Sequence, residues 1–498
     1  MNQLTRLLRA VMTLDAAVPA IEFARHWWTW GDLTRIGQAL DATLLAAGWG
    51  AGVRVGCIMR NRPQIGAAIL ELVCSERCVV TLNPMLPDAR LAADIAAVAP
   101  PVLLAPADYW ERPALLAAAR ALGCLVLALT DSADQPVRVV AAAGALAAPV
   151  RPSAPGIAVE MMTSGTTGTP KRVPLSAHTL ERGILDAAVY EKRDPSKPQL
   201  RRGVQVVNAP FAHMSGVFAL CNAVAAGRSI CLLDHFNVPD WLDALSRHRP
   251  PATSAPPAAL RMILDARVPR EALACLKVFR VSTAPLDPDL AERFYETYGI
   301  PVLQNYGATE YAGGVAGWTL GDFEKYHAAK RGSVGRISPG IEARVTDPDS
   351  GAVLPPGEQG LLELRASHIG AGGSWLRTTD LAVLDADQFL WIKARADNVI
   401  MRGGFKVFPD DVVRAIEKHP AVREAAVVGL PDARLGQVPV AAWIPKAGAA
   451  PVDEATLRAF LADHLTRYQI PVRILAVEAL PRTPSLKVSQ PELAKLFA

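Results

Sequence analysis

The feature that most constrains the fold is an alternation of strand-like and helical segments through the first half of the chain. Short apolar runs are interleaved with segments whose apolar residues recur at helical spacing. Strands that alternate with helices predict an α/β fold built on a mainly parallel sheet. The strand-like runs are Val53–Met59, Cys78–Leu82, Val102–Ala105, Leu125–Leu129, Gln205–Asn208 and Ser229–Leu233; helical segments are Leu33–Ala47, Pro63–Leu72, Val217–Ala226 and Leu290–Tyr298, the last ending at Gly299.

The pattern changes after about residue 330. Short β runs separated by turn residues predict an antiparallel β subdomain, and the C-terminal residues mix both types. The β runs are Ile341–Thr346, Gly360–Arg365, Leu381–Leu384 and Phe389–Ile392. We therefore predict a large N-terminal domain, 1–395, with its β subdomain at about 330–395, and a small mobile α+β C-terminal domain, 396–498. The charged segment Lys393–Arg402 is the predicted linker.

Composition excludes several classes of protein. Lys and Arg total 52 against 48 Asp and Glu, and no basic run is interleaved with aromatic residues, which argues against nucleic acid. The apolar stretches Ala121–Leu129 and Ala141–Val150 are too short to span a bilayer, so we expect core elements and no membrane span. Seven cysteines without paired spacing, and no recognisable signal peptide, favour reduced thiols in a cytoplasmic protein.

The stretch Thr163–Lys171, which reads TSGTTGTPK, carries the clearest chemistry. Its glycines let backbone N–H groups approach an anion, its hydroxyls add donors, and its lysine adds a compact charge. It is not a Walker A loop, because no Gly-Lys-Ser/Thr follows at the required spacing. The stretch predicts a polyphosphate-binding loop. The residues expected to hold phosphate are Thr163, Ser164, Gly165, Thr166, Thr167, Gly168 and Lys171.

Four later motifs are ambiguous when taken singly. Asn305–Glu310 offers an aromatic face and a carboxylate suited to Mg²⁺, but taken alone an ordinary turn after a strand explains it better. Trp375–Asp380 ends in a carboxylate that suits ribose hydroxyls or a hairpin turn. Arg395–Asp397 fits a hinge or a solvated linker, and Pro481–Val488 holds a lysine on a Pro-rich loop or tail.

In this order and at these distances, the motifs resemble the adenylate-forming superfamily, and within it the acyl- and aryl-CoA synthetase branch. The likeness covers nearly the whole chain, including Trp30–Leu33, which looks like the family's usual strand-to-helix transition. The resemblance implies an acid–thiol ligase that uses ATP, Mg²⁺ and CoA. It would form an acyl-adenylate and then a thioester, releasing pyrophosphate and AMP.

The resemblance also implies a role for each matching residue. For the nucleotide, Tyr306 would stack on adenine, Thr309 would contact the α-phosphate, Glu310 would hold Mg²⁺, and Asp380 and Arg395 would bind ribose. Lys487 would bridge the acyl carboxylate and the α-phosphate. For the second half-reaction, Asp397 would be the hinge, and Gly403 and Gly404 would line the pantetheine tunnel. The chain departs from the family pattern at six positions. Arg172, Thr379, Ala394 and Leu486 stand where Gly is usual, Met401 replaces Lys, and Gln490 replaces Arg.

The segment Pro210–Gly216 resembles the element that borders the acyl pocket, where His213 would gate the site or orient the carboxylate, unless it is simply packed. This segment has no Asp to pair with an amine, which argues against an amino-acid substrate. The predicted pocket is mostly apolar or small, which favours an aromatic or medium-chain aliphatic acid. Its residues are His213, Val217, Phe218, Thr283, Ala284, Gly307 and Gly313.

Two alternatives to a CoA ligase stay open at this point. One is a stand-alone adenylating enzyme that loads a carrier protein, and the other is a catalytically weak nucleotide-binding homologue altered at Leu486. Nothing specific favours a luciferase-like oxygenase. We expect a monomer or a homodimer.

Overall fold

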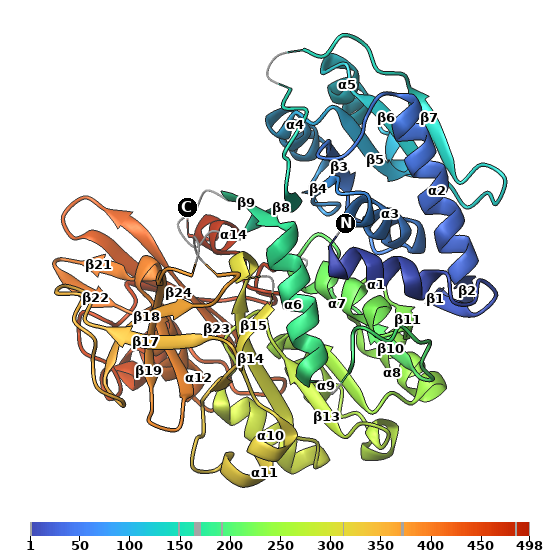
Figure 1. Cartoon of the computed structure of the whole chain (residues 1–498). Helices are drawn as coiled ribbons and strands as arrows, with labels where there is room; N and C mark the ends of the chain where they lie inside the picture. Colours follow the sequence, from blue (N-terminus) through green and yellow to red (C-terminus); the bar gives the residue numbers. More distant parts are fainter. Residues whose placement is uncertain are drawn as a thin grey trace. The chain divides into compact units, whose positions relative to one another are not determined.

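The structure is a computed structural model that describes residues 2–147, 150–163, 171–190, 193–311, 313–369, 373–483 and 486–497. The described chain forms two compact units, which we treat separately (Figure 1). The first unit comprises the residues up to Thr163, Arg172–Ile341 and Ala366–Ser374, and the second comprises Glu342–Arg365 and the chain from Trp375 onward. The predicted domain boundary at 395/396 stays a prediction.

The first unit contains the predicted parallel sheet, a seven-stranded sheet of order β7-β6-β5-β3-β4-β8-β9. Its pairings from β6 to β8 are parallel, and β7 is antiparallel to its neighbour β6. The strands are β3 (Arg54–Ile58), β4 (Cys78–Leu82), β5 (Val102–Pro106), β6 (Leu125–Leu129), β7 (Val137–Ala141), β8 (Ile157–Thr163) and β9 (Lys171–Ser176). The predicted α/β class is therefore confirmed.

Successive residues of these strands point into two different cores. Val79 and Leu104 join a cluster with α2 and α3, whereas Val80 and Leu103 join a cluster with α4 and α5. Side chains alternate across a strand, so helices cover both faces of the sheet. The helices are α1 (Gln3–Met12), α2 (Trp30–Ala46), α3 (Pro63–Cys74), α4 (Asp88–Val98) and α5 (Pro113–Ala121).

One predicted core element is wrong. The stretch Ala141–Val150 leaves the sheet at Ala141, and residues 142–146 are exposed. The reason is position, because β7 is the edge strand and, among the strands that the structure describes, none pairs with its outer side. Small alanine side chains gain little from burial, so this stretch stays on the surface.

Two further groups of strands complete the first unit. One sheet has the order β10-β11-β1-β2, and β12, β13 and β14 run parallel before antiparallel β15 and β16. The strands are β1 (Pro19–Phe23), β2 (His26–Thr29), β10 (Val204–Val207), β11 (Ser229–Leu232), β12 (Ala252–Ala255), β13 (Val278–Val281), β14 (Val302–Ala308), β15 (Gly313–Gly317) and β16 (Gly335–Ile337). The helices are α6 (Ala177–Tyr190), α7 (Met214–Ala225), α8 (Val238–His248), α9 (Pro257–Asp265), α10 (Pro288–Tyr298) and α11 (Leu320–Tyr326).

Local sequence signals explain where several of these helices begin and end. Strand β2 ends at Thr29 and α2 begins at Trp30, the strand-to-helix transition that the resemblance implies, and Thr29 and Asp32 form a capping box there. Helix α10 ends at Gly299, whose φ of 69° is the left-handed conformation that glycine adopts without penalty. Among the described residues, no helix combines the length and the apolar character that a bilayer crossing needs.

The second unit begins with four antiparallel strands, which confirms that the β runs predicted in this part of the chain pair in antiparallel fashion. The strands of the unit are β17 (Glu342–Thr346), β18 (Gln359–Arg365), β19 (Leu376–Leu384), β20 (Phe389–Arg395), β21 (Ile400–Arg402), β22 (Phe405–Val407), β23 (Val422–Asp432), β24 (Gly436–Pro445) and β25 (Arg473–Ala476). The helices are α12 (Pro409–Glu417), α13 (Glu454–Ala462) and α14 (Gln490–Lys495). Alternate residues of β24 pack against α12 and α13 or against α14.

The predicted linker Lys393–Arg402 is shorter than expected. Strand β20 continues to Arg395 because Arg395 pairs with Asp380 of β19, and β21 resumes at Ile400. Only residues 396–399 lie outside strands, and Ala396–Asn398 form a single 3₁₀ turn there.

Candidate active site

In the first unit, predicted pocket residues gather at the carboxyl ends of parallel strands. Val281, the last residue of β13, pairs with Gln304 of β14, so the turn after β13 lies beside Asn305 and Tyr306. Asn208, just past β10, donates a side-chain hydrogen bond of 2.9 Å to the carbonyl of Ser254 on β12. Ligands of open α/β sheets bind at such carboxyl edges.

The hairpin of β14 and β15 shapes one side of this edge. Gly307 pairs with Gly314, and the register shifts between Tyr306 and Gly307. A Cβ on Gly307 would lie 2.2 Å from the carbonyl oxygen of Gly313, so only glycine fits. Thr309 and Glu310 follow in a 3₁₀ turn, Thr309 half-buried and Glu310 exposed. Tyr306, Thr309 and Glu310 therefore stand at one strand end, while their nucleotide roles stay predictions.

His213 lies at the N-cap of α7, where its backbone N–H donates to the carbonyl of Pro210 at 2.9 Å. The loop before α7 is pressed against the helix, because a Cβ on Gly216 would lie 2.2 Å from the carbonyl oxygen of Pro210. The backbone N–H of Phe211 donates to Asn61 at 2.9 Å. His213 is half-buried and held in place by this tightly packed loop.

The remaining pocket candidates differ in exposure. Val217 is fully buried in the core beside α3, so the core accounts for it without a ligand. Phe218 is half-buried, and a Cβ on Gly313 would lie 4.0 Å from its ring and 3.6 Å from Gly183. The structure thus brings Phe218 and Gly313 together. Ala284, half-buried, follows β13.

Thr283 carries two energetic costs at one position. Its φ of 76° lies in the left-handed region, which costs a β-branched residue about 1–2 kcal/mol. Its Oγ1 is also buried without a hydrogen-bond partner among the described residues, and such a group costs about 1–3 kcal/mol. The sequence gives no signal of either cost. Strain of this kind is concentrated at ligand sites.

In the second unit, the predicted ribose-binding residues lie opposite one another. Asp380 of β19 pairs with Arg395 of β20, and the guanidinium Nε lies 4.0 Å from the Asp380 carboxylate. Arg395 also donates to the hydroxyl of Thr379 at 2.7 Å. Thr379, a departure from the family's glycine, therefore helps to orient Arg395.

Lys487 belongs to the same unit and lies near Arg395. Burial, and then the positive charge of Arg395, lower the pKa of the Lys487 ammonium below its usual range. The residue before it, Leu486, has a φ of 62°. This left-handed conformation explains why glycine suits that position, and the leucine adopts it nevertheless. The alternative of a solvated tail is wrong for Lys487, which is half-buried.

The predicted phosphate loop falls mostly outside the described residues. Thr163 ends β8 and Lys171 begins β9, while Ser164, Gly165, Thr166, Thr167 and Gly168 lie outside. Arg172, where the family has glycine, donates to the carbonyl of Thr81 at 2.9 Å and to both carboxylate oxygens of Asp94 at 3.1 and 3.2 Å. This arginine ties β9 to β4 and α4.

Gly403 and Gly404 form the turn of the β21–β22 hairpin, with φ values of 57° and 88°. Two consecutive positive φ angles are the requirement of a type I′ turn, so the hairpin itself explains both glycines. Asp397 lies in the 3₁₀ turn after β20, and its side chain is outside the described part. The tunnel and hinge roles stay predictions.

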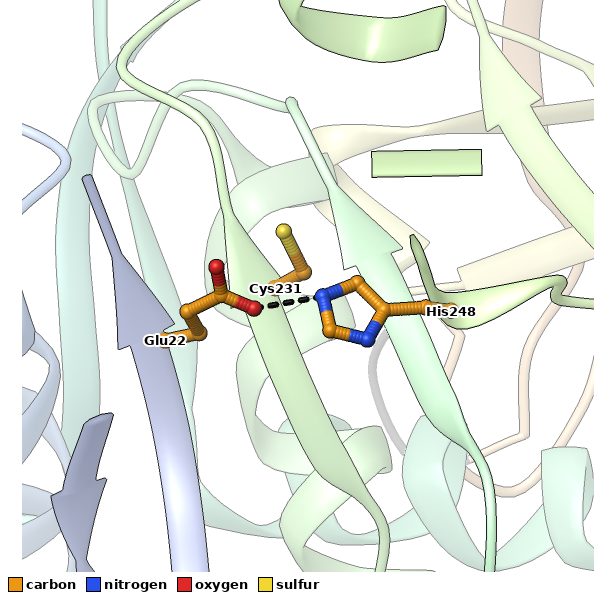
Figure 2. Close-up of side chains that lie close together, drawn as sticks. All are labelled: Glu22, Cys231 and His248. Atoms are coloured by element: carbon orange, nitrogen blue, oxygen red, sulfur yellow. Dashed lines mark hydrogen bonds and ion pairs between the residues drawn. The ribbon is translucent and has the colours of Figure 1, made fainter. Parts of the chain in front are cut away.

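Sequence inspection missed a buried polar cluster far from these motifs (Figure 2). Glu22 of β1 and Cys231 of β11 are paired across parallel strands, and His248 at the end of α8 lies 2.5 Å from the Glu22 carboxylate. These are ligand types for a transition metal, and their candidate ligand atoms lie within 4.8 Å of one another.

A side chain already supplies the positive charge in this cluster. Arg247 donates to Glu22, lies 2.9 Å from His248 Nε2, and lies 4.0 Å from Cys231 Sγ. Burial, and then the charge of Glu22, raise the pKa of the Cys231 thiol to about 11, so the metal-binding thiolate is scarce at neutral pH. We read the group as a buried ion pair that locks α8 onto the sheet.

Comparisons with known proteins agree with the motif order. A family model described as AMP-binding enzyme matches residues 10–372, and a model of the AMP-binding enzyme C-terminal domain matches residues 414–487. The chain is 31% identical over 352 residues to 4-coumarate–CoA ligase-like 9 of Arabidopsis thaliana, an alignment that covers 68% of this chain and 61% of that protein. It is 29% identical over 485 residues to sulfoacetate–CoA ligase of Cupriavidus necator, covering 94% and 92%.

Solved structures share the whole fold. ATP-bound MatB from Rhodopseudomonas palustris gives a TM-score of 0.82 at 24% identity, covering 100% of this chain and 99% of that one. The amide bond synthetase McbA from Marinactinospora thermotolerans gives a TM-score of 0.79 at 27% identity, covering 99% and 100%. These similarities extend over both compact units.

Proposed function

The chain belongs to the AMP-binding enzyme family, the acyl- and aryl-CoA synthetase branch of the adenylate-forming superfamily, and we propose that it activates a carboxylic acid with ATP and transfers the acyl group to CoA. The acid carboxylate would attack the α-phosphorus of ATP, forming a P–O bond as the bond to pyrophosphate breaks. The CoA thiolate would then attack the acyl carbon, forming a C–S bond as AMP leaves with the electron pair of the broken C–O bond.

The grouping of Asp380, Arg395 and Lys487 in one compact unit carries this proposal. The Asp380 carboxylate would accept hydrogen bonds from the ribose hydroxyls. The Lys487 ammonium would neutralise the negatively charged oxygens of the acid carboxylate and the α-phosphate as they approach one another. Phosphoryl chemistry leaves little covalent work to the protein, so positioning and neutralisation would supply most of the rate.

Glu310 is the residue we assign to Mg²⁺. Its carboxylate is exposed at the end of β14, and Mg²⁺ prefers oxygen ligands and keeps several places for phosphates and water. The donor chemistry fits this ion, which when bound would neutralise part of the phosphate charge. Thr309, which is half-buried beside it, would contact the α-phosphate.

We assign an aromatic or medium-chain aliphatic acid to the pocket near His213. Phe218 and Gly313 lie close to one another, and apolar walls would suit such acids. The relatives named for 4-coumarate are in line with an aromatic acid, whereas sulfoacetate is small and anionic. The orphaned hydroxyl of Thr283 favours an acid that also bears a hydrogen-bonding group.

An ATP–pyrophosphate exchange screen over aromatic, aliphatic and amino acids tests the proposal. We expect exchange with aromatic or medium-chain acids and none with amino acids. The responding acid is then offered with CoA, with a holo carrier protein and with an amine, the last because of the amide bond synthetase likeness. Thioester formation with CoA supports the ligase assignment. ATP binding without exchange for any acid would contradict it and favour the weak homologue.

The alignment leaves some properties as predictions. The chain covers 61% and 63% of the lengths of the first two plant relatives, so their whole activities are not transferred. A cytoplasmic location and a monomeric or homodimeric state remain expectations. Size-exclusion chromatography with light scattering measures the second.

A further inference from the structure

We infer that Arg482, itself held by Glu424, is a positioning residue that fixes the peptide carrying Lys487. The inference rests on the proposed function, since it concerns the lysine assigned to adenylation. It goes further because it assigns a role to Arg482 and Glu424, for which the family resemblance implies none. All the contacts involved lie within the second compact unit.

The loop around Lys487 closes as a narrow hairpin. Arg482 and Val488 form an isolated antiparallel bridge, and the N–H of Thr483 donates to the carbonyl of Lys487 at 2.8 Å. The N–H of Leu486 donates to the carbonyl of Thr483 at 2.9 Å. These bonds set the two ends of the loop but do not by themselves fix the peptide between Leu486 and Lys487.

That peptide is the strained one. Leu486 has a φ of 62°, a conformation that costs an L-residue about 1–2 kcal/mol relative to the right-handed region. Without compensation, the loop would gain by rotating this peptide out of the left-handed conformation. Rotation would redirect the Cα–Cβ bond of Lys487 and move its ammonium away from the reacting oxygens.

Arg482 supplies the compensation directly. Its Nη1 donates to the carbonyl oxygen of Leu486 at 2.8 Å, the very oxygen that a rotation would displace. Its Nη2 donates to both carboxylate oxygens of Glu424 at 2.5 and 2.6 Å. The two side chains are 26% and 13% exposed, so water competes only partly for these bonds.

Glu424 ties Arg482 to the sheet because it lies in a paired strand. It lies on β23 and pairs with Ile444 of β24, in the longest strand pair of the unit. The register shifts between Val422 and Glu424, and regular pairing runs from Glu424 onward, so the guanidinium links the start of this paired stretch to a strained peptide. Arginine suits this task because its planar fork holds two partners at fixed angles, which a lysine cannot do.

The test compares Arg482→Met, Arg482→Lys and Glu424→Gln in the two half-reactions. We expect acid-dependent pyrophosphate exchange to lose about tenfold to a hundredfold in kcat with KM nearly unchanged, since a displacement of roughly 1 Å costs that much. Thioester formation from supplied acyl-adenylate should stay at the wild-type rate. The matched control is Arg365→Met, which breaks another Arg–Glu pair between neighbouring strands, with Glu342, and should leave both steps unchanged.

A double variant separates positioning from simple stability. Glycine adopts a positive φ freely, so Leu486→Gly should reduce the loss caused by Arg482→Met, giving non-additive effects. Equal loss of both half-reactions, or strictly additive effects, would overturn the inference. If Arg482→Met does not fold, Glu424→Gln carries the same comparison.

One readout needs no turnover. Peptide-mapped acetylation of Lys487 across pH should show its labelling midpoint moving upward in Arg482→Met, as the lysine leaves its buried place. An unchanged midpoint would overturn the positioning role even if the wild type exchanged no pyrophosphate. Absent wild-type exchange together with a shifted midpoint would instead contradict the proposed function alone.

Discussion

Arg395 and Lys487 place two positive charges near one another in the second compact unit, and this repulsion adds to the burial of Lys487 in lowering the pKa of its ammonium. In the proposed function, the charged form of Lys487 would neutralise the reacting oxygens. As pH rises through the lowered pKa, that form is lost. The alkaline limb of adenylation should therefore fall below the ordinary lysine value of 10.5.

The measurement is kcat/KM for pyrophosphate exchange against pH, because kcat/KM reports the free enzyme. Lys487→Arg is the control, since a guanidinium does not titrate in this range and the limb should vanish. An identical limb in Lys487→Arg would assign the titration to another group.

Arg172 should stabilise the strand that follows the phosphate loop. Arg172→Gly restores the family's usual residue but removes three hydrogen bonds, two of them to Asp94. The pair is only 16% and 17% exposed, so we expect a loss of about 1–3 kcal/mol in the free energy of unfolding, together with a higher KM for ATP. Urea unfolding and ATP-dependent exchange measure the two effects.

The exposed pair of Arg112 and Asp88, whose side chains are 35% and 48% exposed, is the control for this loss. Arg112→Ala should change the free energy of unfolding by less than about 1 kcal/mol. A comparable loss in both variants would mean that Arg172 has no special anchoring role.

Replacing Thr283 should raise the stability of the protein and lower its preference for acids that bear a hydrogen-bonding group. Thr283→Gly removes the strain that a positive φ imposes on threonine, and it removes the buried hydroxyl that lacks a hydrogen-bond partner among the described residues. The free energy of unfolding should therefore rise by about 1 kcal/mol or more. Acids with a hydrogen-bonding group should lose about tenfold or more in kcat/KM relative to their unsubstituted analogues. Exchange assays with matched acid pairs decide, and an unchanged ratio would remove Thr283 from the specificity argument.

The sequence predicts the layers of this fold better than it predicts the site. Cys78–Leu82 and Leu125–Leu129 coincide with β4 and β6 because continuous apolar runs leave a buried parallel strand few alternatives. The same reasoning predicted a core element after Ala141, and that prediction was wrong. Whether a strand lies at the edge of a sheet depends on the order of the strands, which no local sequence pattern contains.

Candidate site residues such as Asp380 and Arg395 were predicted from motif resemblance, and their pairing across β19 and β20 needed the structure. The strain at Thr283 and the link from Arg482 to Glu424 were invisible in the sequence. The strain depends on a backbone angle that the residue types threonine and leucine do not predict. The link depends on a contact between residues far apart along the chain.

The cluster of Glu22, Arg247 and His248 should act as a structural ion pair. Glu22 is 1% exposed, so Arg247→Met leaves a buried carboxylate without the guanidinium that pairs with it, and we expect a loss of about 3–5 kcal/mol in the free energy of unfolding. Replacing both charges, with Glu22→Leu added to Arg247→Met, should recover much of that loss, because no unpaired charge remains. Thermal unfolding at several pH values measures both. If added Zn²⁺ instead raised the melting temperature of the wild type and Cys231→Ser abolished the effect, a metal site would replace this ion-pair interpretation.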